Sequence, residues 1–167
     1  MLMVVLRFIH IVLGVLWVGG IFALSVIIIP GMQQLGLPLD SLTKTLNHRK
    51  FSQIMMAFGG LTVLAGLSMM YILGHGNDAF FQSHFGRTIS LGGLSAILAL
   101  VIGGSVARPT MEKIGRLQAD LGANPPKGDD PRKAQLAGLQ KRAVVSGKLI
   151  VGLLLLAVTC MAVARYI

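Results

Sequence analysis

The stretch LMVVLRFIHIVLGVLWVGGIFALSVIII, residues Leu2 to Ile29, contains only two ionisable side chains, Arg7 and His10. At 1.5 Å per residue, a helix of this length exceeds the roughly 20 residues that cross a ~30 Å hydrocarbon layer. The apolar run is also much longer than the ~7–15 residues of a secretory signal core, and it lacks a basic leader. We therefore expect a retained membrane-spanning helix.

Three further apolar stretches without charged residues follow, at 51–73, 89–107 and 149–164. With 54% hydrophobic residues, the chain has room for a helical bundle and its loops but not for a separate soluble module. The sequence predicts an all-α membrane protein, a four-transmembrane-helix bundle that forms a single transmembrane domain over 1–167. The expected helices are residues 2–29, 51–73, 88–107 extending to about 121, and 136–166.

The connection between the third and fourth stretches has helical character of its own. Apolar residues recur at helical spacing over 109–121 and again from 136 to 143, and turn-forming residues occupy 122–131. We expect the third and fourth helices to project beyond the membrane as a helical hairpin, on the cytoplasmic side.

The fifteen lysines and arginines divide unequally between the two sides of such a bundle. The side that holds the N-terminus carries Arg7, Arg87 and Arg165, and the other twelve lie in the first and third loops. By the positive-inside rule, those two loops are cytoplasmic and the chain is N-out and C-out. The net charge of +9 is then mostly a topology signal, and the lipid bilayer is the expected partner. The sequence has no basic patch interleaved with base-stacking aromatics, so we expect no nucleic-acid partner.

His10 is the most informative single residue, because an ionisable group costs free energy in hydrocarbon and is by default a site hypothesis. Gly14 and Trp17 share its helical face through the i, i+4, i+7 spacing. Counting along the helices from the outer side places His10 level with Gly66 of the second helix. The arginines at the outer helix ends, Arg7 and Arg87 among them, lie nearer the interface.

This constellation is typical of a b-type haem site. An imidazole can ligate the iron, glycine leaves room for the macrocycle, an aromatic ring can pack on it, and arginines can hold the propionates. His75, His84, Met69 or Met70 could supply a second axial ligand, or the iron could be five-coordinate. The alternative is that His10 hydrogen-bonds a neighbouring helix and that Trp17 is a packing residue. The expected cofactor-binding residues are His10, Arg7, Gly14, Trp17, Gly66 and Arg87.

Copper is a second interpretation of the same cluster, because imidazole and thioether ligands suit it. The metal-ligating candidates would then be His10, His75, His84, Met69 and Met70. No catalytic motif of a common enzyme class is present, and none of the six acidic residues lies in a predicted span, which disfavours a proton-coupled transporter. Catalytic residues therefore stay unknown.

Small residues recur along the second and third helices. Ser95, Ala99, Gly103 and Ala107 occupy every fourth position of the third, and Gly59, Gly60 and Gly66 lie in the second. Such stripes let helix backbones approach closely, either within the protomer or at a face of a homo-oligomer. We favour packing within the protomer.

The run Arg7-Phe8-Ile9-His10, followed by Leu16-Trp17-Val18-Gly19-Gly20 and Pro30, resembles the first helix of CopD-like copper-resistance and related small bacterial membrane proteins. It also resembles HemJ-type protoporphyrinogen oxidases, in which a first-helix histidine followed by tryptophan and glycine is associated with haem. The segments 49–66 and 161–166 extend the CopD-like resemblance, and Arg87 stands where HemJ-type proteins carry a lysine. The resemblance implies a bacterial cell inner membrane and a haem-ligand role for His10.

These observations predict a haem-binding membrane protein with a redox, electron-transfer or haem-related accessory role. A membrane redox partner is expected to interact with such a protein. The alternative is a non-enzymatic structural subunit of a membrane complex or a CopD-like copper-handling protein.

Overall fold

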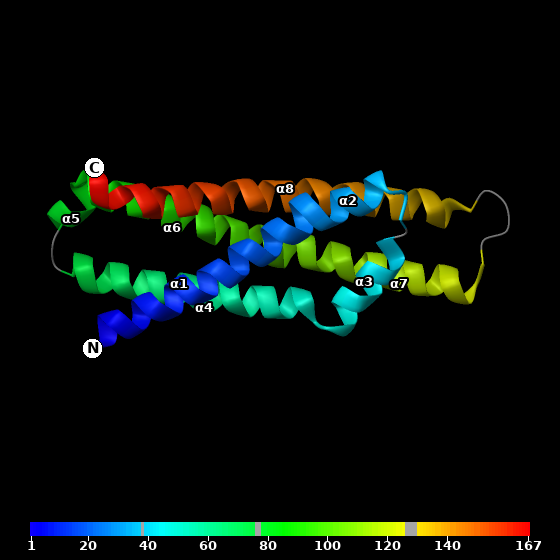
Figure 1. The fold of residues 1–167 in the computed structure, drawn as a ribbon, viewed down its shortest axis with the longest axis horizontal. Coiled ribbons are helices and arrows are strands. Elements are labelled where there is room, and N and C mark those ends of the chain that lie inside the picture. Colours follow the sequence, from blue (N-terminus) through cyan, green and yellow to red (C-terminus); the bar gives the residue numbers. More distant parts are fainter. Residues whose placement is uncertain (38, 76–77, 126–129) are drawn as a thin grey trace.

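The computed structural model describes residues 1–37, 39–75, 78–125 and 130–167, and this part of the chain is helical nearly throughout, without strands (Figure 1). Four continuous helical rods dominate it. They run over residues 2–34, 51–74, 84–123 and 131–166, and each is long and apolar enough to cross a membrane. The prediction of an all-α chain with four helices able to span a membrane is confirmed.

The first and third rods each contain a π-helical segment, and two short helices lie in the connections. The first rod consists of α1 (Leu2–Phe22), η1 (Ala23–Ile28) and α2 (Ile29–Gln34), and the second is α4 (Phe51–Gly74). The third consists of α6 (His84–Ile102), η2 (Gly103–Ala107) and α7 (Arg108–Ala123), and the fourth of α8 (Pro131–Val163) and η3 (Ala164–Tyr166). The short helices are α3 (Leu39–His48) and α5 (Asp78–Gln82).

The third and fourth rods begin four and five residues earlier than the sequence predicts, at 84 and 131 instead of 88 and 136. Side-chain caps explain the difference. The Ser83 hydroxyl accepts a hydrogen bond from the Gly86 N–H at 3.0 Å, and the Asp130 carboxylate accepts one from the Arg132 N–H at 2.9 Å. Such caps satisfy N–H groups that lack an intrahelical partner, so the helix extends back to the capping residue.

α1 packs against α4 along a contact that we call the first seam. Large and small residues face each other across it. A Cβ placed on Gly59 would lie 2.6 Å from the Trp17 ring, and one placed on Gly66 would lie 2.9 Å from the His10 ring. Between these pairs, a Cβ placed on Gly14 would lie 3.4 Å from the Thr62 methyl group. The small residues of one helix therefore receive the large side chains of the other.

α6 packs against α8 along the second seam. Gly92 lies so close to α8 that an added Cβ would be 2.9 Å from Cβ of Cys160. Ala99 and Leu154 are each only 1% exposed, and both belong to the buried core together with Trp17 and Ile150. The small-residue stripe of the third helix thus serves packing within the protomer, and Cys160 is a buried packing residue.

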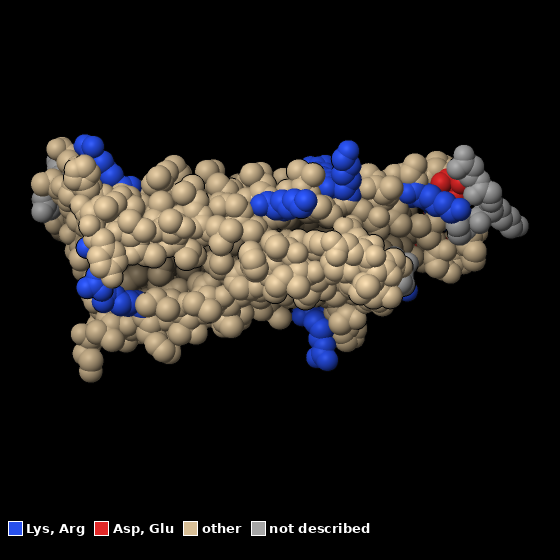
Figure 2. All heavy atoms as spheres, turned by 45° about the horizontal axis from the view of Figure 1, so that its top comes forward, with Lys and Arg blue, Asp and Glu red and all other residues tan. Residues whose placement is uncertain are grey.

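The exterior of the bundle is apolar over a length that matches a membrane. Many large aliphatic side chains of α1, α4, α6 and α8 are exposed. Arg87 and Arg108 are 21 positions apart on one rod, or about 31 Å of helix, close to the ~30 Å of a hydrocarbon core. Figure 2 shows lysines and arginines at one end and along the opposite half of the molecule, with an uncharged stretch between them. Both chain termini lie at the same end (Figure 1).

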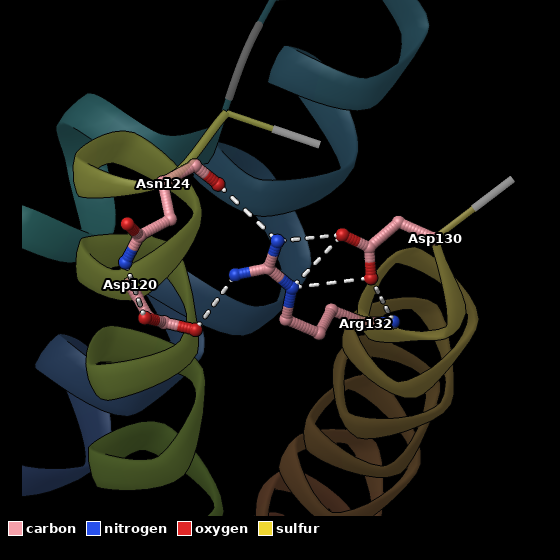
Figure 3. Close-up of polar contacts among 4 residues, drawn as sticks. All are labelled: Asp120, Asn124, Asp130 and Arg132. Atoms are coloured by element: carbon pink, nitrogen blue, oxygen red, sulfur yellow. Dashed lines mark hydrogen bonds and ion pairs between the residues drawn. The ribbon is translucent and has the colours of Figure 1, made fainter. Parts of the chain in front are cut away.

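Beyond this apolar stretch, α7 packs against the beginning of α8, and an arginine joins the two helices (Figure 3). The Arg132 guanidinium forms ion pairs with Asp120 of α7 at 2.9 Å and with Asp130 at 2.6 Å. It also donates a hydrogen bond to the Asn124 carbonyl at 3.2 Å. These contacts hold the C-terminal end of α7 against the N-terminal end of α8. The cytoplasmic location of this end of the bundle stays a prediction.

Candidate functional site

His10 lies in the first seam, where its ring is partly buried between α1 and α4. The Nδ1 atom is 2.8 Å from the backbone carbonyl oxygen of Thr62. Because a carbonyl oxygen can only accept, Nδ1 must carry the hydrogen and donate it. In a neutral imidazole this arrangement leaves Nε2 with a free lone pair, which is the tautomer that a metal-ligating histidine needs.

Gly66 makes this hydrogen bond possible. It lies one turn after Thr62 in α4, directly beneath the imidazole, and a Cβ there would be 2.9 Å from Cε1 and 3.1 Å from Nδ1 of His10. Any larger residue would push the ring away from the carbonyl. The juxtaposition of His10 and Gly66, expected from depth along the helices, is therefore present in the structure.

A cavity of about 260 Å³ adjoins His10. Side chains of α1, α4 and α6 supply most of its wall, with Phe80 of α5 and Met161 of α8 completing it. The lining is mainly aliphatic, aromatic and thioether, and its polar side chains are Arg7, His10 and Thr62. An apolar cavity with a few convergent polar groups is the usual form of a small-molecule or cofactor site.

The Thr62 side chain adds an unusual feature to this wall. It is only 6% exposed, and its hydroxyl oxygen has no hydrogen-bond partner among the described residues. Buried polar atoms in proteins almost always have a partner, and an exception calls for an explanation such as an absent ligand or water. Because the oxygen itself is buried, a group bound in the cavity would reach it only if the wall moved.

The structure brings together only part of the predicted cofactor set. Arg7, Gly66, Met69 and Met70 line the cavity together with His10. Gly14 and Trp17 do share the helical face of His10, but that face is the packing surface against α4. The Trp17 ring fills the space over Gly59 and is 4% exposed, and the cavity that it lines is a different one.

The remaining candidates lie at the same end of the bundle but outside the cavity wall. His75, His84 and Arg87 are all exposed, and the His75 ring makes an edge contact with Tyr71, with centroids 5.1 Å apart. No group of three or more histidine, cysteine, aspartate or glutamate side chains within the described ranges could hold a metal ion. A metal at this site would depend on His10 and thioether ligands.

Sequence reasoning missed most of the cavity wall, and three of the residues that it missed are Met3, Thr62 and Met161. A signal existed for each of them. Met3 precedes His10 by seven positions and so shares its helical face, and Thr62 lies one turn from Gly66 on α4. Met161 lies in the fourth apolar stretch, near the end that shares its side of the bundle with the N-terminus.

Comparisons with models of protein families, with curated proteins and with solved structures find no match to this chain. A functional assignment therefore depends on the chemistry of the cavity.

Proposed function

We propose that the chain is a b-type haem-binding membrane protein and that Nε2 of His10 is an axial ligand to the iron. One observation carries the proposal. The Nδ1–H group donates to the Thr62 carbonyl at 2.8 Å, which fixes the ring and leaves Nε2 available. Histidines that ligate metals in proteins generally donate their other ring N–H to a carbonyl or carboxylate in this way.

The residues around His10 fit such a group in kind. The wall is apolar, and Gly66 and Gly93 leave space in it because they have no side chain. The Arg7 guanidinium could pair with a propionate. Small-molecule sites usually measure about 300–1,000 Å³, so a cavity of about 260 Å³ is just below the usual range. Binding a macrocycle would require wall residues to move, and the thioether side chains of Met69 and Met70 are flexible enough to do so.

A bound haem would supply one-electron chemistry, with a potential that depends on its axial ligands and on burial. The chain's own residues would hold the imidazole in one orientation, exclude water from the cavity and place a cation at its rim. We further propose the topology predicted by the cation count, an inner-membrane protein with both termini outside and the helical hairpin in the cytoplasm.

Copper binding is the second candidate, and the methionines of the wall favour it. Four thioethers line the cavity beside the single imidazole, a soft ligand set that suits Cu(I). The four methionines are Met3, Met69, Met70 and Met161.

The structural-subunit alternative corresponds to a cavity that binds neither haem nor copper.

An absorption spectrum of the purified full-length protein, from cells supplied with haem and copper, separates these candidates. We expect a Soret band in the wild type, and we expect its loss or a large shift in His10→Ala. Gly66→Ala should have a similar effect, because its Cβ would displace the imidazole. Gly60→Ala is the matched control on the same helix, because nothing lies within 4 Å of an added Cβ there.

Each other outcome contradicts the haem proposal in a distinct way. A protein without a Soret band that retains copper through purification, and loses it in His10→Ala, would establish the copper site instead. A protein with neither group would leave His10 as a packing histidine. A Soret band that survives His10→Ala unchanged would place the haem elsewhere.

A further inference from the structure

Two further hollows lie at the cation-rich half of the molecule, away from the cavity beside His10. The first is a groove of about 470 Å³, which we call the basic groove. The second is an apolar cavity of about 120 Å³ between the helices, which we call the crevice. Leu46, Ser52 and Arg108 line both of them, so the two are adjacent parts of one surface feature. A polar compartment next to an apolar one is the shape that an amphiphile requires.

The basic groove carries a strong excess of positive charge. One acidic residue lines it, Glu112, and this carboxylate forms an ion pair with Arg108 at 3.0 Å. Among the described residues, the other three cations have no acidic partner within ion-pair distance. They come from α3, from the α3–α4 connection and from α7, and are Lys44, Lys50 and Arg116.

The backbone at Lys50 has an unusual conformation in the turn between α3 and α4. Its φ of 51° and ψ of 32° lie in the left-handed helical region, and it is the only non-glycine residue with positive φ in the described part of the chain. A residue with a Cβ is less stable in this conformation than glycine is. A residue in this conformation commonly ends a helix, and here it sets the turn from which Lys50 lines the basic groove.

The crevice is bounded by both π-helical segments of the molecule. η1 contributes Leu24 and Ser25, and η2 contributes Gly103 and Ala107. Such segments are rare and occur frequently at functional sites. The only tryptophan of the chain, Trp17, lies deeper in the same wall.

We propose that the groove and the crevice together bind an anionic phospholipid. The phosphate-bearing headgroup would lie among Lys44, Lys50, Arg108 and Arg116, and part of one acyl chain would enter the crevice. Because a cavity of about 150 Å³ holds one benzene molecule, the crevice of 120 Å³ accepts only a few carbons of that chain. The rest of the lipid would stay in the bilayer, which surrounds the apolar exterior. Basic pockets between membrane helices are known to bind acidic headgroups.

Trp17 reports directly on this site. We would reconstitute the full-length protein in phosphatidylcholine vesicles and replace a small fraction of the lipid with acyl-brominated phosphatidylglycerol. The bromine atoms quench tryptophan on contact, and Trp17 is nearly inaccessible to bulk lipid because it is 4% exposed. We expect saturable quenching several-fold stronger than with brominated phosphatidylcholine at the same mole fraction. Equal quenching by the two lipids would overturn the proposal.

Two double variants separate a specific site from general surface charge. Lys44→Gln with Lys50→Asn removes two groove charges, and asparagine tolerates the left-handed conformation at position 50. Since each cation near a membrane contributes to the attraction of anionic lipid, we expect about a tenfold or larger loss of apparent affinity for brominated phosphatidylglycerol. Lys113→Gln with Lys141→Gln removes two cations that do not line the basic groove.

The control pair should change the apparent affinity by less than about twofold. Similar losses in both double variants would show a diffuse effect of surface charge and refute a defined site. Complete reversal of the quenching by micromolar inorganic phosphate would show that the groove prefers a free anion to a lipid and would contradict the proposal. None of these measurements depends on His10 or on a bound metal.

Discussion

The two helix seams use the same packing device but differ in how their polar groups are satisfied. In the second seam, the Ser95 hydroxyl donates to the Gly92 carbonyl of its own helix at 2.8 Å, and Ser95 is only 3% exposed. In the first seam, an imidazole reaches across to the other helix, and a cavity lies beside it. The Thr62 hydroxyl in that wall has no partner among the described residues.

This difference indicates which helix contact in the bundle is the better candidate for a binding site. A contact that serves only packing can satisfy each polar group locally, because every membrane helix already pairs its own backbone. The first seam departs from that rule at His10 of α1 and at Thr62 of α4, which lies one turn before Gly66. It therefore combines a packing half around Trp17 with a polar half around His10.

The largest expected effect is in the packing half of the first seam. Gly59→Ala would place a Cβ 2.6 Å from the Trp17 ring and 2.9 Å from the Leu100 side chain. Overpacking of this kind usually costs about 1–3 kcal/mol, so we expect the free energy of unfolding to fall by that amount. A denaturant titration in detergent micelles measures it. Gly60→Ala, the adjacent control with open space, should be neutral or slightly stabilising. Equal destabilisation of both would disprove the close approach at Gly59.

The corresponding change in the second seam tests whether that contact is purely structural. In Gly92→Ala the new Cβ would lie 2.9 Å from Cβ of Cys160 and 3.3 Å from the Ala157 carbonyl oxygen. We expect a loss of about 1 kcal/mol, near the lower end of the range for overpacking. Gly152→Ala on α8, with nothing within 4 Å, is the control. Any cofactor spectrum should be unchanged in Gly92→Ala, whereas the same substitution at Gly66 should alter it.

Most of the helical architecture could be predicted from the sequence, because runs such as 51–73 without charge have one stable solution in a bilayer. Depth along the helices also paired His10 with Gly66. The role of Trp17 could not be predicted, because a shared helical face does not reveal what lies opposite, and Gly59 receives the ring. The Thr62 hydroxyl and the backbone of Lys50 depend on local geometry that composition does not encode. Residues 84–87 and 131–135, which follow the caps Ser83 and Asp130, are helical although the sequence prediction places them in loops.

A smaller effect, of opposite sign in the two seams, should follow from removing one hydroxyl from each. Thr62→Val keeps the shape of a buried side chain and deletes an oxygen without a partner in the described structure. We expect a neutral result or a stabilisation of up to about 1 kcal/mol in protein without ligand. Ser95→Ala deletes a hydroxyl that is hydrogen-bonded, and should cost about 0.5–1.5 kcal/mol. Unfolding titrations of both variants in one detergent compare them. A substantial loss in Thr62→Val would mean that its hydroxyl does have a partner.

The smallest expected effect lies beyond both seams, at the ion pairs of Arg132. Hydrogen bonds from this guanidinium hold the pKa of Asp130 below its usual value. A carboxylate with a lowered pKa in the folded state contributes stability above the unfolded pKa of about 3.9, and this contribution is lost as the pH falls through the lowered value. Because the groups are near the surface, Arg132→Gln should leave global unfolding almost unchanged.

Local hydrogen exchange makes that small effect measurable and tests its separation from the seams. At pH 7, amides in the first turn of α8 should exchange faster in Arg132→Gln than in the wild type, because the Asp130 cap loses the partner that holds it. The difference should persist at pH 4 and shrink only as the pH falls through the lowered pKa of Asp130, where the wild-type carboxylate loses its charge too. Amides beside Gly66 and Gly92 should exchange at equal rates in both proteins. Faster exchange there would show that the ends of α7 and α8 are coupled to the seams, and that the polar half of the first seam cannot be treated as an independent site.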